Sequence, residues 1–527
     1  MPRLVLACSV LIVSACAARG PSPQLVAELG KADALVREGC YACLKEALAI
    51  YERLAVAQRP PDGSRQGAFD AARLIALREK ELGLPFEAAM DRARKASAQI
   101  PAVVPPAVAT HLAAALVLDA AGLFIGETSG MDPEQRAQFT GRGMPALDPT
   151  APGRRALDNA PASDFIAAYL GLAIDCEQTR LRDSIDMAAL KARYAALPLM
   201  QFRMASCARG GGGDARLVRD ANPRWLDTLP WEARRELAGT GPERNIDLLR
   251  VVALLTQARE AFPASFAIAM LWAQTNMSLA EYATALSGYD DVLSPSPTHR
   301  DAMLGRLTSL SYLMRHDDAI ATATRLIDLG TWHIGDAHYW RAWNYYNLKN
   351  YEPAWQDVEK ALTLLSNSSV YMLAGLIEYA RVNLPMAIQR FDRSFEIDGT
   401  NCDAVWMSGL VNVDQQAWAP ASPKFSKAMS CFVTAAARAK GDLDRLEALI
   451  EGRGDPPTTR QLKQRESYQK QIATADERAA QAAFNAAQGY GRLGQRGPAL
   501  THVDLAVAHP KMKEKAEALK AAIEKLP

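Results

Sequence analysis

Alanines recur at an almost constant interval through the second half of the chain. Ala285, Ala319, Ala354, Ala387 and Ala421 are separated by 34, 35, 33 and 34 residues. A period of this length accommodates two helices and two turns, and one such unit cannot bury its apolar face alone. The sequence therefore predicts a linear stack of helix pairs, in which each pair packs only against its neighbours.

The residues around these alanines define a packing frame. In the clearest copy, Ala342 and Tyr345 fall on the first helix, and Ala354, Val358 and Ala361 fall on the second. Small residues allow two helix backbones to approach closely, and a large residue fills the space beside them. The next two copies supply Gly375, Ala387, Phe391 and Ser394, and then Gly409, Ala421, Phe425 and Ala428.

This frame resembles the tetratricopeptide repeat (TPR), a helix-turn-helix unit of about 34 residues. The resemblance is closest over residues 265–432, and it is partial near Ala47 and Tyr51 and again around Ala487 and Ala499. It implies an all-α fold, a right-handed α-solenoid of TPR-like helix-turn-helix repeats with a less regular helical middle region. It also implies that the groove of the solenoid binds a protein or peptide partner.

The amino-terminal residues have the features of an export signal. Arg3 precedes an apolar run, residues 4–13, which is too short to cross a bilayer as a helix. Val13-Ser14-Ala15-Cys16 resembles the lipobox of bacterial lipoproteins, which implies that Cys16 carries the lipid and that the protein contacts the membrane through this anchor. Ala17 then favours the cell envelope, as an outer-membrane lipoprotein facing the periplasm. Without a lipid, Ala15-Cys16-Ala17 would be the cleavage site of a secreted protein.

Six cysteines remain after Cys8 and Cys16, and an even number suits disulfides in an oxidising compartment. Cys402 and Cys431 fall at the first and thirtieth positions of one repeat, which predicts a bond at the open end of that helix pair. Cys176 and Cys207 form a second predicted pair, and Cys40 and Cys43 a local bridge. The alternative is that all six are buried free thiols.

Charge and motifs argue against several functions. The 60 basic and 59 acidic residues leave a net charge of +1 and no field that would gather nucleic acid. Residues 489–494 fit G-x-G-x-x-G but lie within a repeat instead of after a strand, so we predict no dinucleotide cofactor. His333 and His338 are not on one helix face, so we predict no metal site. We find no catalytic motif and expect no enzyme activity.

Aromatic residues are dense between Trp332 and Trp355. A helix that presents rings on all sides cannot bury every one within its own repeat. Tyr339, Trp343 and Tyr346 fall outside the packing frame of the first helix, and the resemblance places such residues on the concave face. They are therefore candidates for partner binding, since tyrosine and tryptophan are common at interfaces. The alternative is that most of these rings form core between repeats.

The chain divides into five expected segments. They are a signal peptide (1–15), N-terminal TPR-like pairs (16–100), an irregular helical region with loops (101–262), the TPR array (263–432), and a charged insertion with C-terminal TPR-like helices (433–527). The leading hypothesis is a lipid-anchored envelope scaffold or adaptor. One alternative is an enzyme or glycan-binding protein with its site around residues 130–155, and another is a structural subunit of a large envelope assembly.

Overall fold

The computed structural model describes residues 20–98, a few positions between 165 and 172, and residues 187–207, 215–238, 248–330, 333–453, 456–457 and 459–526. Within these residues all regular structure is helical, which confirms the predicted all-α fold. None of these helices is long and apolar enough to cross a bilayer. Cys16, Cys176 and the loop 130–155 lie outside the described residues, as does the side chain of Cys207.

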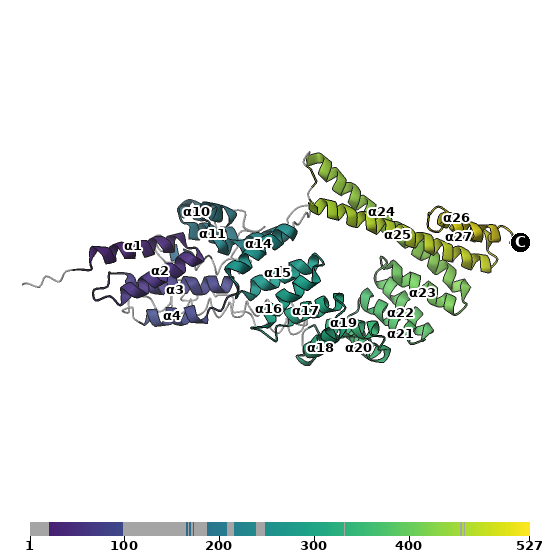
Figure 1. The fold of residues 1–527 in the computed structure, drawn as a ribbon, viewed down its shortest axis with the longest axis horizontal. Coiled ribbons are helices and arrows are strands. Elements are labelled where there is room, and N and C mark those ends of the chain that lie inside the picture. The colour runs from purple at the N-terminus through teal and green to yellow at the C-terminus, as the bar shows by residue number, and fades with distance from the viewer. Residues whose placement is uncertain are drawn as a thin grey trace, which may run out of the picture. The chain divides into compact units, whose positions relative to one another are not determined.

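The chain forms two compact units (Figure 1). Unit 1 comprises Met1–Gly126 and Arg136–Trp272, and unit 2 comprises Glu127–Gln135 and Ala273–Pro527. The division falls inside helix α15 (Phe266–Ser278), whereas the sequence placed the start of the array at residue 263.

Unit 1 begins with two helix pairs, α1 (Pro23–Glu38) with α2 (Tyr41–Ala55) and α3 (Ser64–Glu81) with α4 (Glu87–Ser97). The face of α2 that the sequence singled out, Ala47, Tyr51 and Leu54, is buried. The Tyr51 ring packs directly against Gly67 of α3. A Cβ atom at Gly67 would lie 2.3 Å from the ring, so no larger residue fits at that position. A glycine therefore allows these helices to pack closely.

Shorter helices complete unit 1. They are α10 (Met187–Arg193), α11 (Pro198–Cys207), α12 (Ala215–Ala221), η1 (Leu226–Thr228), α13 (Leu229–Ala238) and α14 (Leu248–Ala261). In the irregular helical region, α10 ends at Arg193 and a new helix starts at Pro198. Proline is favoured at the first position of a helix and disfavoured inside one, which explains the break.

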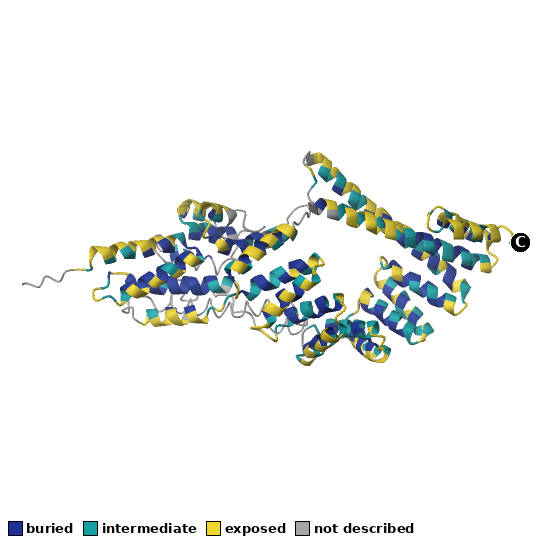
Figure 2. Ribbon diagram, in the orientation of Figure 1, coloured by how far each residue is buried: buried dark blue, intermediate teal, exposed yellow. Residues whose placement is uncertain are grey.

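Unit 2 is a succession of antiparallel helix pairs (Figure 1). After α15 come α16 (Tyr282–Leu293), α17 (Arg300–Tyr312), α18 (His316–Asp328), α19 (Ile334–Asn347), α20 (Tyr351–Leu364), α21 (Ser368–Ala380), α22 (Leu384–Ile397) and α23 (Cys402–Asp414). All five periodic alanines are 0% exposed. Figure 2 shows the buried residues on the faces where the helices meet. The predicted packing frame is therefore the core of this unit.

The turn inside each repeat has a recurring backbone conformation. The residue five positions before each periodic alanine has a positive φ. The amide of the residue that follows it donates to the carbonyl of the residue five positions before that amide, at 2.8–3.0 Å, as Glu281 donates to Asn276. This is the Schellman arrangement, which satisfies carbonyls at the end of the first helix. The residues concerned are Ala280, Met314, Lys349, Val382 and Gln416, and Gly494 repeats the pattern before Ala499.

Two long helices follow the array. α24 (Trp418–Arg453) and α25 (Thr459–Arg492) pair along their length, so the charged insertion expected within 433–527 belongs to a helical hairpin (Figure 1). α26 (Arg496–Val507) and α27 (Lys513–Ile523) complete the unit. Gly489 lies in α25 beside Ser422, and Gly494 forms the next turn. The glycines of the G-x-G-x-x-G pattern therefore serve packing and a turn.

Candidate functional site

The three aromatic residues singled out by the sequence share one face of α19. Tyr339, Trp343 and Tyr346 follow one another at intervals of four and three residues, which is the spacing of neighbours on a helix. The same positions are apolar 33 residues later on α21 and another 34 later on α23. We call the nine residues the apolar stripe: Tyr339, Trp343, Tyr346, Met372, Leu376, Tyr379, Trp406, Leu410 and Val413.

Helix contacts indicate which side of the array carries the stripe. The first helices of successive repeats touch one another, α17 with α19 and α19 with α21, whereas successive second helices approach less closely among the described helices. In a curved stack, the elements that approach most closely lie on the inside of the curve. The first helices α17, α19 and α21, and the part of the stripe on α19 and α21, therefore line the inner surface of the array.

Each ring of the α19 group is half-buried. Tyr339, Trp343 and Tyr346 pack against the core formed by residues such as Ala342 and Leu373. Burial raises the pKa of both tyrosine hydroxyls above the ordinary value. The rings thus belong in part to the core between repeats, as the alternative supposed, and keep their other side accessible. A ring held by packing loses little conformational entropy when a partner binds.

On α23, the first position of the stripe is buried. Trp406 is only 8% exposed, because its ring packs edge-on against Phe425 and Phe432, with centroids 5.4 and 6.5 Å away. On α21, the Tyr379 hydroxyl donates to the Asp414 carboxylate of α23 at 2.6 Å, and this hydrogen bond raises the pKa of Tyr379. A carboxylate therefore lies against the tyrosine that the stripe has on α21.

The other end of the stripe continues into residues that the sequence analysis missed. Tyr312 of α17 is 50% exposed and stacks on Tyr282 of α16 with ring centroids 4.5 Å apart. Tyr312 also contacts Trp340, which contacts Tyr339, with centroids 5.5 and 5.3 Å apart. The aromatic surface thus extends into the preceding repeats. The repeat around Ala319 has the weakest packing pattern, so its sequence gave no reason to examine Tyr312.

His333 and His338 each contact a different carboxylate. His333 Nε2 lies 2.7 Å from Asp301 Oδ1, and His338 Nδ1 lies 2.7 Å from Asp357 Oδ1. The hydrogen bonds to Asp301 and Asp336 raise the pKa of His333 to about 9. Across the part of the chain that the structure describes, no three histidine, cysteine or acidic side chains gather as a metal site would require. Both histidines therefore contact carboxylates of neighbouring helices.

The structure contains two of the expected disulfides. One joins Cys402, at the start of α23, to Cys431 in α24, and so connects the two helices of one pair. The other joins Cys40 to Cys43 at the beginning of α2, where the Cys43 amide also donates to Cys40 Sγ at 3.0 Å. Cys40 and Cys43 are fully buried, so a redox partner has no access to them.

No family model matches the sequence, and no curated protein matches it either. Several solved TPR structures resemble parts of the chain. The C-terminal part of a TPR protein from Cytophaga hutchinsonii is 15% identical, covers 56% of this chain and 98% of its own, and gives a TM-score of 0.38. A TPR protein from Parabacteroides merdae is 15% identical, with coverages of 57% and 99% and a TM-score of 0.33.

YrrB, described as a TPR protein with an unusual peptide-binding site, is 19% identical, with coverages of 34% and 91% and a TM-score of 0.29. The description of this chain as a TPR-like α-solenoid rests on its own helix pairs, alanine period and turns.

Proposed function

We propose that this protein is a non-catalytic scaffold or adaptor, and that the apolar stripe of unit 2 binds an apolar segment of a partner polypeptide. The observation that carries the proposal is the recurrence of large apolar side chains at the same three positions of α19, α21 and α23, all of them half-buried except Trp406. Those on α19 and α21 lie on the inner surface, where one bound segment contacts several repeats at once. Tyrosine and tryptophan often contribute most of the binding energy at interfaces.

We further propose that the scaffold acts in the cell envelope on a lipid at Cys16. The motif Val13-Ser14-Ala15-Cys16 supports the lipid, and the two disulfides support an oxidising compartment. The intact mass of the membrane-extracted protein tests this part. A mature chain that starts at a diacylated Cys16 is the expected result, and an unmodified Cys16 in the mature protein would contradict it.

The binding surface is tested by photo-crosslinking in the cells that make the protein. A photoreactive phenylalanine analogue replaces Trp343 in the stripe, and in a matched control it replaces Gln356, which is exposed on α20. We expect a defined adduct with one partner at position 343 and none at position 356. The same adducts at both positions would count against the stripe.

A second pair of variants measures affinity once that partner is identified. Leu376→Ala shortens a stripe residue, whereas Leu364→Ala shortens an exposed leucine at the end of α20. We expect Leu376→Ala to weaken binding about tenfold and Leu364→Ala to leave it unchanged, because residues outside an interface contribute little. Equal affinities of the two variants would refute the assignment.

A further inference from the structure

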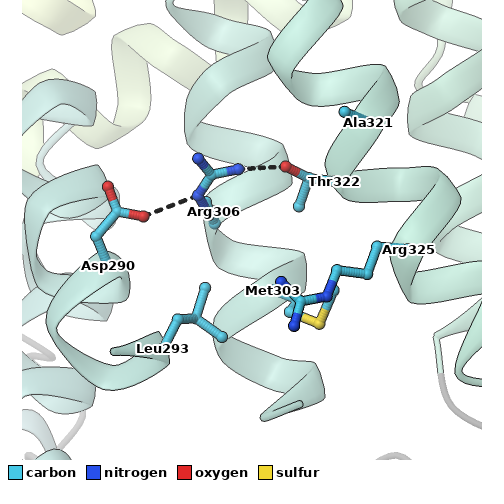
Figure 3. Close-up of a pocket in the computed structure, with 7 residues that line it drawn as sticks. All are labelled: Asp290, Leu293, Met303, Arg306, Ala321, Thr322 and Arg325. Atoms are coloured by element: carbon cyan, nitrogen blue, oxygen red, sulfur yellow. Dashed lines mark hydrogen bonds and ion pairs between the residues drawn. The ribbon is translucent and has the colours of Figure 1, made fainter. Parts of the chain in front are cut away.

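A cleft in unit 2 lies between α16, α17 and α18, on residues other than those of the apolar stripe (Figure 3). Its volume is about 300 Å³, which is at the lower end of the range for small-ligand sites. Its lining residues are Asp290, Leu293, Met303, Arg306, Ala321, Thr322 and Arg325.

The cleft carries an excess of positive charge. Arg306 donates through Nε to Asp290 Oδ1 at 2.8 Å and through Nη1 to the Thr322 hydroxyl. Asp290 is 52% exposed, so this pair is open to water. The Arg325 side chain extends toward Met303 (Figure 3) and makes no hydrogen bond or ion pair in the described part of the chain. Two guanidinium groups therefore face one carboxylate.

In the next repeat, the arginine equivalent to Arg306 is paired with a buried carboxylate. Arg341, Asp357 and His338 stand 35 residues after Arg306, Thr322 and Met303. Asp357, only 6% exposed, accepts two hydrogen bonds from Arg341 and pairs with His338, all at 2.7 Å.

In the cleft, the position of that buried carboxylate is taken by Thr322, whose hydroxyl is uncharged. Arg306 therefore occupies the position of Arg341 but lacks a buried carboxylate at the position of Asp357.

We propose that this cleft binds a carboxylate that is joined to a short apolar group. The carboxylate lies between Arg306 and Arg325. It accepts hydrogen bonds from Arg306, as Asp357 accepts them from Arg341 one repeat later. Guanidinium groups suit this role because they donate paired hydrogen bonds in the geometry of a carboxylate. The apolar group packs on Leu293 and Met303, which line the remaining wall. The ligand is thus about the size of one amino-acid residue.

Methyl NMR of the full chain, with labelled methionine, tests the proposal directly. N-acetyl-leucine is the probe, and N-acetyl-leucinamide, which lacks the charge, is its control. We expect the acid to shift the Met303 methyl signal in a saturable way and the amide to leave it in place. The Met303→Leu variant identifies the signal. An equal response to acid and amide would overturn the proposal.

Three variants test whether the ligand binds in the cleft or elsewhere on the protein surface. Arg325→Gln, at an exposed position that tolerates the change, is expected to weaken binding about tenfold through the loss of a charge-assisted bond. Lys360→Gln changes the equivalent position of the next repeat and should leave binding intact. Thr322→Asp supplies the missing carboxylate from the chain itself and should abolish binding. Wild-type affinity in both Arg325→Gln and Thr322→Asp would overturn the proposal.

Two further probes identify the source of the carboxylate. If 4-methylpentanoate binds as well as N-acetyl-leucine, the cleft accepts a free organic acid. If only N-acetyl-leucine binds, the cleft accepts the carboxyl terminus of a polypeptide with an apolar last residue. Either result supports the carboxylate site. Inorganic phosphate that binds as tightly as N-acetyl-leucine would overturn it, since the cleft would then select charge alone.

Discussion

Unit 1 and the repeat array of unit 2 are both helical, but they are stabilised over different distances along the chain. In unit 1, Arg78 pairs with Asp227 across 149 residues, and Arg203 pairs with Glu81 across 122. In the array, the corresponding pairs connect neighbours, such as Arg341 with Asp357 across 16 residues and Lys424 with Asp392 across 32. The array is therefore stabilised repeat by repeat, whereas unit 1 needs segments from both ends of its sequence.

The pairs that Arg78 and Arg203 form in unit 1 are buried. The Arg78 side chain is fully enclosed, lies over the Phe202 ring at 4.0 Å, and contacts both Asp227 and Glu81. Burial disfavours the charged form of Arg78, but Asp227, Tyr169 and Glu81 outweigh burial and raise the pKa of its guanidinium. A buried charge that loses its partner is strongly destabilising. This network is thus the most sensitive part of unit 1.

The largest effect is expected from Asp227→Ala. The change leaves the Arg78 guanidinium buried without its main partner, and we expect unit 1 to lose about 3–5 kcal/mol of unfolding free energy. Urea denaturation of the purified protein measures the loss. Asp290→Ala, which breaks a solvent-open pair of the array, is the matched control and should cost less than about 1 kcal/mol. Equal losses would remove the distinction between the two regions.

The next largest effect concerns the end of the array. Replacement of Cys402 and Cys431 together by alanine opens a loop with a sequence separation of 29. In the chain-entropy model this lowers the stability of the α23–α24 pair by about 3 kcal/mol. Hydrogen exchange should show faster exchange in α23 and in the first half of α24, with α16–α18 unchanged. Faster exchange throughout the array would contradict the repeat-by-repeat picture.

A smaller effect depends on pH. The pKa of His333 is about 9 in the folded protein and about 6.5 in an unfolded chain. The pair with Asp301 therefore stabilises the fold fully below pH 6.5, and this contribution is lost as the pH rises to 9.

Asp301→Asn removes this contribution. Its stability deficit relative to wild type should be roughly 1–2 kcal/mol at pH 6 and should shrink by pH 9.5, after allowance for partial solvent screening. Denaturation curves at both pH values measure it, with Asp317→Asn, at an exposed position of α18, as control. A deficit independent of pH would show that His333 is not the group involved.

The smallest effect is a stabilising one. Val382 has φ 63° in the turn between α21 and α22 and is 76% exposed. A β-branched residue is strained in this conformation and makes few contacts here, so Val382→Gly should raise stability by about 0.5–1 kcal/mol. Thermal unfolding measures the change. Val433→Gly, at a 52% exposed position inside α24, is the contrasting variant and should lower stability.

Much of the array was predictable because its packing is local. The spacing of Ala285, Ala319, Ala354, Ala387 and Ala421 identified positions that the structure buries completely. Tyr339, Trp343 and Tyr346 were found because they fell outside that frame. The left-handed turns were missed, because five of the six residues in that conformation are not glycine.

The sequence by itself determined the helix pairs, their period and their buried small residues, since these depend on neighbours within about 40 positions. Only the tertiary structure decided that Arg78 meets Asp227 and that Tyr312 extends the aromatic surface. It also decided that Arg306 and Arg325 line one cleft with a single carboxylate, Asp290, among its lining residues. These features depend on which side chains meet in space, and a period along the chain carries no information about charges and rings that belong to different helices.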